Sequence, residues 1–234
     1  MRLLKLLLEG RCVQVKILFC NIAWMLYYKG LIPGEVEPRS GGEYVRKTAD
    51  AHEKFNFLPV DLTFADKSLP DGRYCLGFVE TKATGKEKAN QLHIERIAGC
   101  SACGSEPAVD DVLVVYCATH PAHSFTTVVG WYRNATVFRE YQAAEFEDGI
   151  QNYNAIAKAE DCVLLPAPVR SRRTLWNIPR RNSGAAFGFG RSNVWFATGD
   201  EGNEELLSKF LKELEKNILG YHGENWLDKH PDGQ

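Results

Sequence analysis

The 234-residue sequence lacks any apolar run long enough to cross a bilayer, since its longest runs, LLKLLL and VKILFCNIAWMLYY, are short and the second contains an asparagine. An export signal is not expected either, because MRLLKLLL is followed at once by EGR instead of a cleavage site. The seven cysteines, an odd number, do not indicate a disulfide framework in a chain of this length. We therefore expect a cytoplasmic protein.

Signatures of common enzymes are missing as well. The sequence has no serine-nucleophile motif and no phosphate-binding Walker loop. GFGRSN at 188–193 is only half of a dinucleotide fingerprint, without a third glycine or a surrounding βαβ pattern. No cofactor is predicted, and catalytic activity is not expected of this chain alone.

Strand patterns dominate what is present. Apolar, β-branched or alternating runs predict strands at 15–24, 72–81, 91–97, 110–120, 126–141, 153–158 and 162–165. The runs at 110–120 and 126–141 flank a PAHS turn and are expected to pair as a hairpin.

The last element differs, because Asn203 suits an N-cap and apolar residues then recur at helical spacing over 203–219. The predicted fold class is therefore α+β, a strand-rich curved sheet or small β-barrel with a C-terminal helix. We expect one domain over 15–219, a non-native or disordered extension at 1–14, and a tail or linker at 220–234.

One segment has an unusual charge. Residues 162–199 contain six arginines, no lysine and no acid, so they carry +6 in a chain whose net charge is −2. Arginine suits bidentate contact with phosphate, and the interleaved aromatic residues suit stacking on unpaired bases. The alternative is that Phe187, Trp195 and Phe196 belong to the core and the arginines form a solvated face. Taken as a whole, the segment favours nucleic acid.

Two other clusters suggest different chemistry. Cys100 and Cys103 with His120 and His123 have the ligand types of a zinc site, although the H-x-x-H spacing is short. The alternative is loop cysteines and turn histidines.

Acids and a lysine form the second cluster. Asp71, Glu80 and Lys82 echo the PD…ExK pattern of metal-dependent nucleases, in which the carboxylates hold magnesium. PDG before a strand is also an ordinary turn, and a turn with a strand is the favoured interpretation.

Three blocks resemble a known family. VKILFCNIAWMLYYKG, DDVLVVYCATHP with VVGWYRNATVFREYQ, and EDCVLLP with NIPRRN and GFGRSNVWFA resemble the N-terminal recognition module of modification-dependent restriction enzymes of HNH and related types. The resemblance covers most of 15–197. The acid-bounded strand, the turn and the VVGW strand are also similar to EVE, YTH and other PUA-like domains, which are small β-barrels that bind a modified base in an aromatic cage.

The resemblance implies a DNA-binding module that flips a modified base into an aromatic pocket. No H-N-H cluster follows the terminal helix, so cleavage would belong to a nuclease domain or subunit outside this chain. Candidates for the cage are Trp24, Tyr27, Trp131 and Trp195. Candidates for reading the base edge are the amides of Asn21, Asn134 and Asn193. The phosphate contacts are assigned to Arg172, Arg173, Arg180, Arg181 and Arg191. The rival functions are a metal-dependent nuclease and a PUA-like RNA-binding domain.

Overall fold

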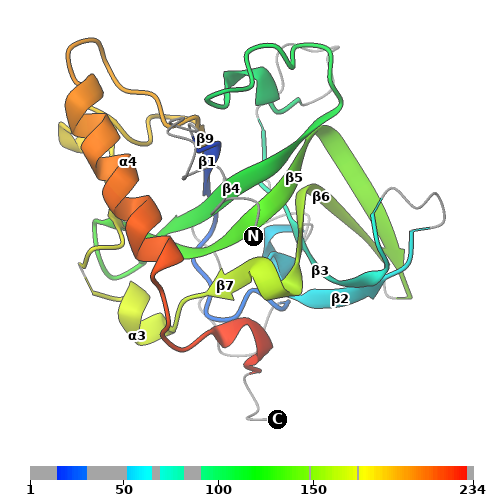
Figure 1. Ribbon diagram of the computed structural model, residues 1–234. Coiled ribbons are helices and arrows are strands. Elements are labelled where there is room, and N and C mark those ends of the chain that lie inside the picture. Colours follow the sequence, from blue (N-terminus) through cyan, green and yellow to red (C-terminus); the bar gives the residue numbers. More distant parts are fainter. Residues whose placement is uncertain are drawn as a thin grey trace.

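The computed structural model describes residues 15–30, 52–64, 69–81, 91–147, 149–172 and 174–230 (Figure 1). Within these ranges, nine strands form one mixed sheet in the order β2-β3-β6-β5-β4-β1-β9, and β7 and β8 pair with β5. Among these strands, β2 and β9 end the order and do not pair with each other, so the sheet is open. The strand-rich α+β class with a helix near the C-terminus is confirmed, in the form of a sheet and not of a closed barrel.

The strands are β1 (Ile17–Asn21), β2 (Pro59–Leu62), β3 (Gly72–Gly77), β4 (Ala108–Thr119), β5 (Thr126–Phe146), β6 (Gly149–Lys158), β7 (Cys162–Leu164), β8 (Asn177–Ile178) and β9 (Val194–Trp195). The helices are α3 (Ala167–Arg170) and α4 (Glu204–Leu219). Short 3-10 turns are η1 (His52–Phe55), η2 (Ile94–Arg96), η3 (Ala159–Asp161), η4 (Arg181–Ser183) and η5 (Trp226–Asp228).

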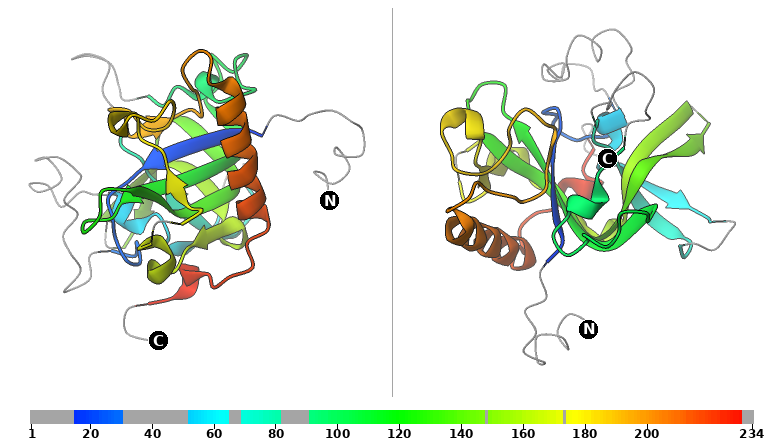
Figure 2. Two further views of the ribbon diagram at one scale, coloured as in Figure 1. Left: turned by 90° about the vertical axis from the view of Figure 1, so that its left-hand side faces the viewer. Right: turned by 90° about the horizontal axis from the view of Figure 1, so that it is seen from above.

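The predicted hairpin is the centre of the sheet. β4 and β5 pair antiparallel from Thr119↔Thr126 to Ala108↔Phe138, and β1 lies parallel to β4. β5 is 21 residues long. Its register shifts against both β4 and β6, and such irregularities bend a strand and increase its twist. One strand therefore serves both halves of a curved sheet (Figure 2).

The strand predicted at 91–97 is wrong. This segment turns through η2, with local bonds from the Arg96 amide to the His93 carbonyl and from the Ile97 amide to the Ile94 carbonyl. Leu92, Ile94 and Ile97 are buried, so the apolar spacing that suggested a strand is produced by a turn packed on the core.

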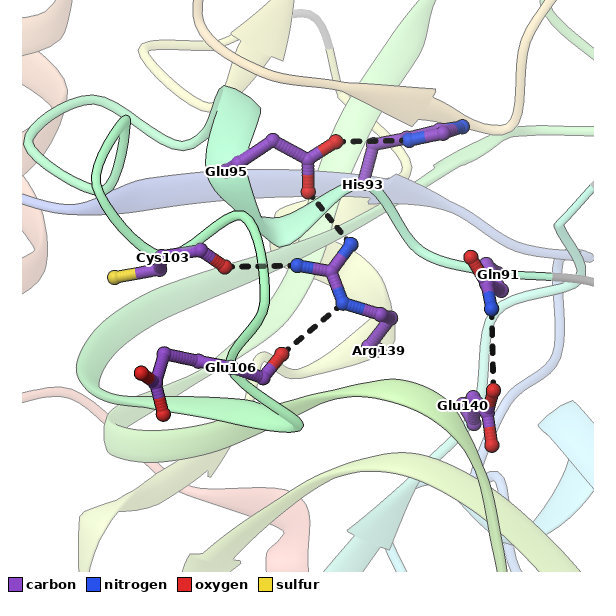
Figure 3. Close-up of polar contacts among 7 residues, drawn as sticks. All are labelled: Gln91, His93, Glu95, Cys103, Glu106, Arg139 and Glu140. Atoms are coloured by element: carbon purple, nitrogen blue, oxygen red, sulfur yellow. Dashed lines mark hydrogen bonds and ion pairs between the residues drawn. The ribbon is translucent and has the colours of Figure 1, made fainter.

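Arg139 of β5 attaches this turn to the sheet (Figure 3). Its guanidinium donates to the carbonyls of Cys103 at 2.8 Å and Glu106 at 3.0 Å, and to Glu95 Oε2 at 2.7 Å. Burial alone would raise the pKa of Glu95, but hydrogen bonds from its own backbone, Arg139 and His93 lower it to about 2. The positive charge of Arg139 is thus neutralised inside the fold.

The core has one cluster on each face of the central strands and a smaller third one. The helix predicted over 203–219 is confirmed, and α4 covers the second cluster. Its predicted stripe packs there, with two residues buried and three partly buried: Leu214, Ile218, Leu207, Phe210 and Leu211. Figures 1 and 2 show α4 on the same face of the sheet as the yellow-to-orange segment that follows α3.

Part of the segment predicted as a tail belongs to the core. Trp226 and Leu227 are buried in the first cluster. The Asn225 side chain accepts a hydrogen bond from the Leu164 amide and donates one to the Cys162 carbonyl, both at 3.0 Å. Asn225 therefore extends the pairing of β7, and the described residues up to 230 continue from the folded domain.

Candidate nucleic-acid interface

Three segments meet where β1 and β4 end and β5 begins. Thr119 Oγ1 lies 3.0 Å from Thr126 Oγ1 across the hairpin, and the Asn21 amide donates to the Asn193 carbonyl at 2.7 Å. β8 pairs with Thr126 and Thr127, which brings the arginine-rich segment to the same place. We call Asn21, Thr119, Thr126, Arg180 and Asn193 the hairpin site.

Arg180 connects these segments. Its Nη2 donates to Asn21 Oδ1 at 2.6 Å, its Nε donates to Thr126 Oγ1, and its guanidinium lies 5.6 Å from the centre of the Phe189 ring. Burial lowers its pKa. Both side-chain acceptors are uncharged, so Arg180 is held in place without losing its positive charge to a carboxylate.

The chain around Arg180 needs a glycine. Arg180 bridges to Phe189, and the Phe189 amide donates to the Pro179 carbonyl at 3.2 Å. Gly188, which directly precedes Phe189, has a φ of +110°, and a Cβ at this position would collide with the Pro179 carbonyl oxygen. Gly188 is therefore required where the backbone at 188 approaches the backbone of Pro179 closely.

The other arginines have different roles. Arg172 and Arg191 are exposed, and no acid pairs with either among the residues that the structure describes. Arg181 pairs with Asp200 at 2.7 Å. Arg170 is fully buried and donates to the carbonyls of Met25 and Leu26 at 2.9 and 2.6 Å. Of the five assigned to phosphate, Arg173 lies outside the described residues.

The structure corrects the predicted tryptophan cage. Trp131 is 1% exposed and stacks on Trp176 with 5.3 Å between ring centres. Trp195 is 5% exposed, with the Phe19 ring at 4.4 Å and the Phe187 ring at 6.2 Å, both stacked on it. Both tryptophans belong to the core under α4 because β5 and β9 direct them to that face. Neither has a ring face open to a base.

Of the remaining cage candidates, Trp24 is also a core residue, 9% exposed in the first cluster, and Tyr27 lies nearer the surface. Tyr27 is half-buried and stacks on Trp226 at 5.5 Å. Trp24 follows β1, and the guanidinium of Arg170 lies 5.2 Å from the centre of its ring. The His120 ring packs edge-on to Trp24 at 4.4 Å. Trp24 therefore contacts His120 at the hairpin turn.

The three asparagines are not together. Asn21 and Asn193 meet in the hairpin site, and the Asn193 side chain reaches the Glu80 carbonyl at 3.5 Å. Asn134 is exposed and donates to Asp161 Oδ1 at 3.2 Å. Asn134 lies eight positions after Thr126 along β5, which is about 25 Å of extended strand. Asn134 is therefore not part of the same site.

A row of rings extends from Trp24 along the hairpin turn. His120 and His123 lie 4.6 Å apart, and His123 stacks on Phe125 at 5.2 Å with an angle of 12° between the ring planes. We call Trp24, His120, His123 and Phe125 the ring ladder. From the sequence, the two histidines were expected only as turn residues or metal ligands, and Phe125 was not a candidate.

The protonation state of His120 follows from its contacts. The Ala122 amide donates to His120 Nδ1 at 3.1 Å, so that nitrogen must carry a lone pair. Burial, and then the charges of His123 and Arg170, lower the pKa of His120. Both observations favour the neutral ring of His120, with its proton on Nε2.

Glu53 is a second residue that the sequence analysis missed. Its Oε2 accepts from the Ala23 amide at 3.0 Å, and the backbone of Glu80 also donates to it. Burial raises its pKa to about 7. This carboxyl joins the chain after β1 to the chain after β3, beside Asn21 and Asn193. A partly buried acid in η1 has no distinctive sequence signal.

The predicted nuclease residues are not brought together. Asp71 precedes β3, where its Oδ1 accepts from the Phe64 amide at 3.1 Å, whereas Glu80 follows the other end of that strand. The six residues of β3 span about 20 Å, too far for two carboxylates to share a metal ion. Lys82 lies outside the described residues. The strand of the favoured interpretation is confirmed as β3.

The predicted zinc ligands do not assemble either. Across the described part of the chain, no three histidine, cysteine or acidic side chains gather as a metal site. Cys100 is buried in the core, and burial raises its pKa. His120 and His123 belong instead to the ring ladder.

The structure also has a surface cavity of about 460 Å³ elsewhere. Its lining mixes both charges, and includes Asp71, Arg73, Lys158, Glu160 and Asp228. Arg73 pairs with Asp228 at 2.7 Å, and Lys158 with Glu160 at 3.9 Å. This balance does not favour an anionic ligand, so the cavity is not part of the candidate interface.

Comparisons with family models, curated proteins and solved structures find no match for the chain. Among the described helices, none has both the length and the apolar character needed to cross a membrane.

Proposed function

We propose that the chain is a DNA-binding module that recognises a modified base, and that it acts in the cytoplasm as the specificity part of a modification-dependent restriction system. The arginine-rich segment and its resemblance to such modules suggest this function. The observation that carries it is the hairpin site, where Arg180 is fixed by the neutral oxygens of Asn21 and Thr126. A kinship with PUA-like domains is part of the proposal.

Each group has a task in this proposal. Arg172 and Arg191, which are exposed, contact phosphates, and Arg180 adds positive charge at the centre of the site. Asn21 and Asn193 present amides to the edge of the base. Unstacking a base costs a few kcal/mol, which ring contacts and edge hydrogen bonds must return. One added methyl group contributes only about 1 kcal/mol, so discrimination by a single contact is modest.

The nuclease alternative finds no support, because Asp71 and Glu80 flank opposite ends of β3. Cleavage is therefore assigned to a nuclease domain or subunit that is not part of this chain. Single-stranded RNA remains the rival ligand, and it is an arm of the test.

The test measures affinity by fluorescence anisotropy for one duplex in three forms: unmodified, cytosine-methylated and adenine-methylated. Tighter binding of a modified form supports the proposal, and equal binding of all three contradicts it. A stronger preference for single-stranded RNA favours the rival. Replacing Arg172 and Arg191 together by alanine should lower the slope of log K against log salt by about 2. Arg73→Ala, which removes an arginine at the surface cavity, is the control and should leave the slope unchanged.

A further inference from the structure

The ring ladder ends in two aromatic groups that lie outside the core. His123 is exposed and Phe125 is half-buried, and neither belongs to the three clusters into which the described core residues fall. Aromatic side chains usually contribute to stability through burial. These two rings instead stack on each other on the surface of the hairpin turn, so packing of the core does not account for them.

The turn holds the rings in a fixed arrangement. The His123 amide donates to the His120 carbonyl at 3.0 Å, and the Ala122 amide donates to the His120 ring. Thr119 and Thr126 close the hairpin beneath it at 3.0 Å. His120 in turn packs on Trp24, whose ring lies against the buried Arg170. The outer rings are therefore attached to the core through a continuous set of contacts.

Positive charge adjoins the same turn. Thr126, which follows Phe125 directly, accepts the hydrogen bond from Arg180 Nε. A pair of stacked rings at the surface offers a flat apolar face on which an unpaired base can stack, and Arg180 is bonded to the same hairpin through Thr126.

We propose that His123 and Phe125 form a stacking platform for one unpaired nucleobase. The proposal rests on the proposed function, since it names the part of that interface that receives the base. It replaces the predicted cage of Trp131 and Trp195 with two rings that the fold leaves on its surface.

The experiment separates stacking from the reading of a modification. Affinity is measured for a fully paired duplex and for the same duplex with one bulged, unmodified thymine. The double variant His123→Ala/Phe125→Ala should bind the bulged duplex about 5- to 150-fold more weakly than the wild-type protein does. Its affinity for the paired duplex should change less than about twofold, because phosphate contacts carry that binding.

Single variants test whether a flat ring is what matters. Phe125→Tyr should keep the preference for the bulged duplex, whereas Phe125→Leu, which is apolar but not flat, should lose it. Phe146→Ala is the matched control, because Phe146 is also half-buried but lies at the far end of β5. Unchanged thermal unfolding of His123→Ala and Phe125→Ala would show that the variants are folded.

The outcomes distinguish the two proposals. If the double variant loses affinity for the bulged duplex only, the result supports the stacking platform. If the protein binds DNA but the double variant binds both duplexes as the wild type does, or loses both equally, the platform is wrong and the DNA-binding proposal stands. If the wild-type protein binds neither duplex, the proposed function is wrong and the platform falls with it.

Discussion

The hairpin site and the surface cavity use arginine in opposite ways. At the cavity, Arg73 faces Asp228 at 2.7 Å, and the neighbouring Lys158 faces Glu160. At the hairpin site, Arg180 donates to an amide oxygen and a hydroxyl oxygen. A carboxylate cancels the charge of its partner, whereas a neutral oxygen only fixes the position of the guanidinium. The first region pairs its charges, whereas the two side-chain acceptors of Arg180 at the hairpin site are both uncharged.

The proposed function needs a local excess of positive charge in a chain whose net charge is −2. A polyanion responds to the charge within about one Debye length, not to the total. Acids are absent from 162–199, and Asp200, which follows this segment directly, pairs with Arg181. Variants that change the excess of arginine over acids in this segment, or that disturb the core beneath it, test the comparison between the hairpin site and the surface cavity.

The largest effect is expected from Trp131→Ala. The ring is buried between Trp176 and Tyr221, so its removal should lower the free energy of unfolding by about 3 to 5 kcal/mol. Urea unfolding followed by circular dichroism measures this. If the variant is as stable as the wild-type protein but binds DNA more weakly, Trp131 contacts the base and is not a core residue.

The second-largest effect is expected from Arg170→Ala, which should lower the free energy of unfolding by about 3 kcal/mol. Its guanidinium donates to the carbonyls of Met25 and Leu26, and removal leaves buried acceptors without these donors. Arg172→Ala is the control within the same arginine run, and its stability should change by less than about 0.5 kcal/mol because Arg172 is exposed. Equal losses in the two variants would contradict the division into buried and surface arginines.

Two carboxyls should give stability opposite dependences on pH. The pKa of Glu53 is raised from 4.5 to about 7, so its contribution is present below pH 4.5 and is lost as pH rises to about 7. The pKa of Glu95 is lowered from 4.5 to about 2, so its contribution is present above pH 4.5 and is lost as pH falls towards 2.

Chemical unfolding between pH 2 and pH 8 measures both slopes. Glu53→Gln should remove the dependence of stability on pH between about 4.5 and 7 only. Glu95→Gln should remove the dependence between about 2 and 4.5 only. These two variants extend the comparison of charged and neutral partners to carboxyl groups. Glu95 has an arginine partner at 2.7 Å, whereas Glu53 accepts from backbone amides near the hairpin site. If the stability of the wild-type protein does not change between about pH 4.5 and 7, Glu53 has an ordinary pKa.

Most of the fold was predictable because its signals are local. The β4–β5 hairpin follows from two β-rich runs around a turn, and α4 follows from its apolar stripe. The strand predicted at 91–97 was wrong because Leu92 and Ile94 alternate as in a strand, while Arg139, more than 40 residues later, holds the chain as a turn. The buried Trp226 was missed because its short segment is polar on both sides.

The site was predicted less well, because residue type does not determine which side of the sheet a ring faces. Trp131 and Trp195 have the chemistry of a base cage, but α4 covers them. Arg180 and Asn21 were both named, yet their contact joins residues 159 positions apart and has no sequence signal. Phe125 was overlooked because one ring in a turn is ordinary until His123 is seen to stack on it.

The smallest effect, and the most direct test of the comparison, comes from two acids. Asp200→Asn removes the partner of Arg181, and Asp228→Asn removes the partner of Arg73. Both ion pairs are exposed, so each change should alter stability by less than about 1 kcal/mol. Both variants gain one positive charge, but only Asp200→Asn gains it beside the arginine-rich segment. Its log K against log salt should therefore steepen by about 0.9, with a few-fold tighter binding at low salt. Equal steepening in Asp228→Asn would mean that total charge, and not its place on the molecule, governs binding.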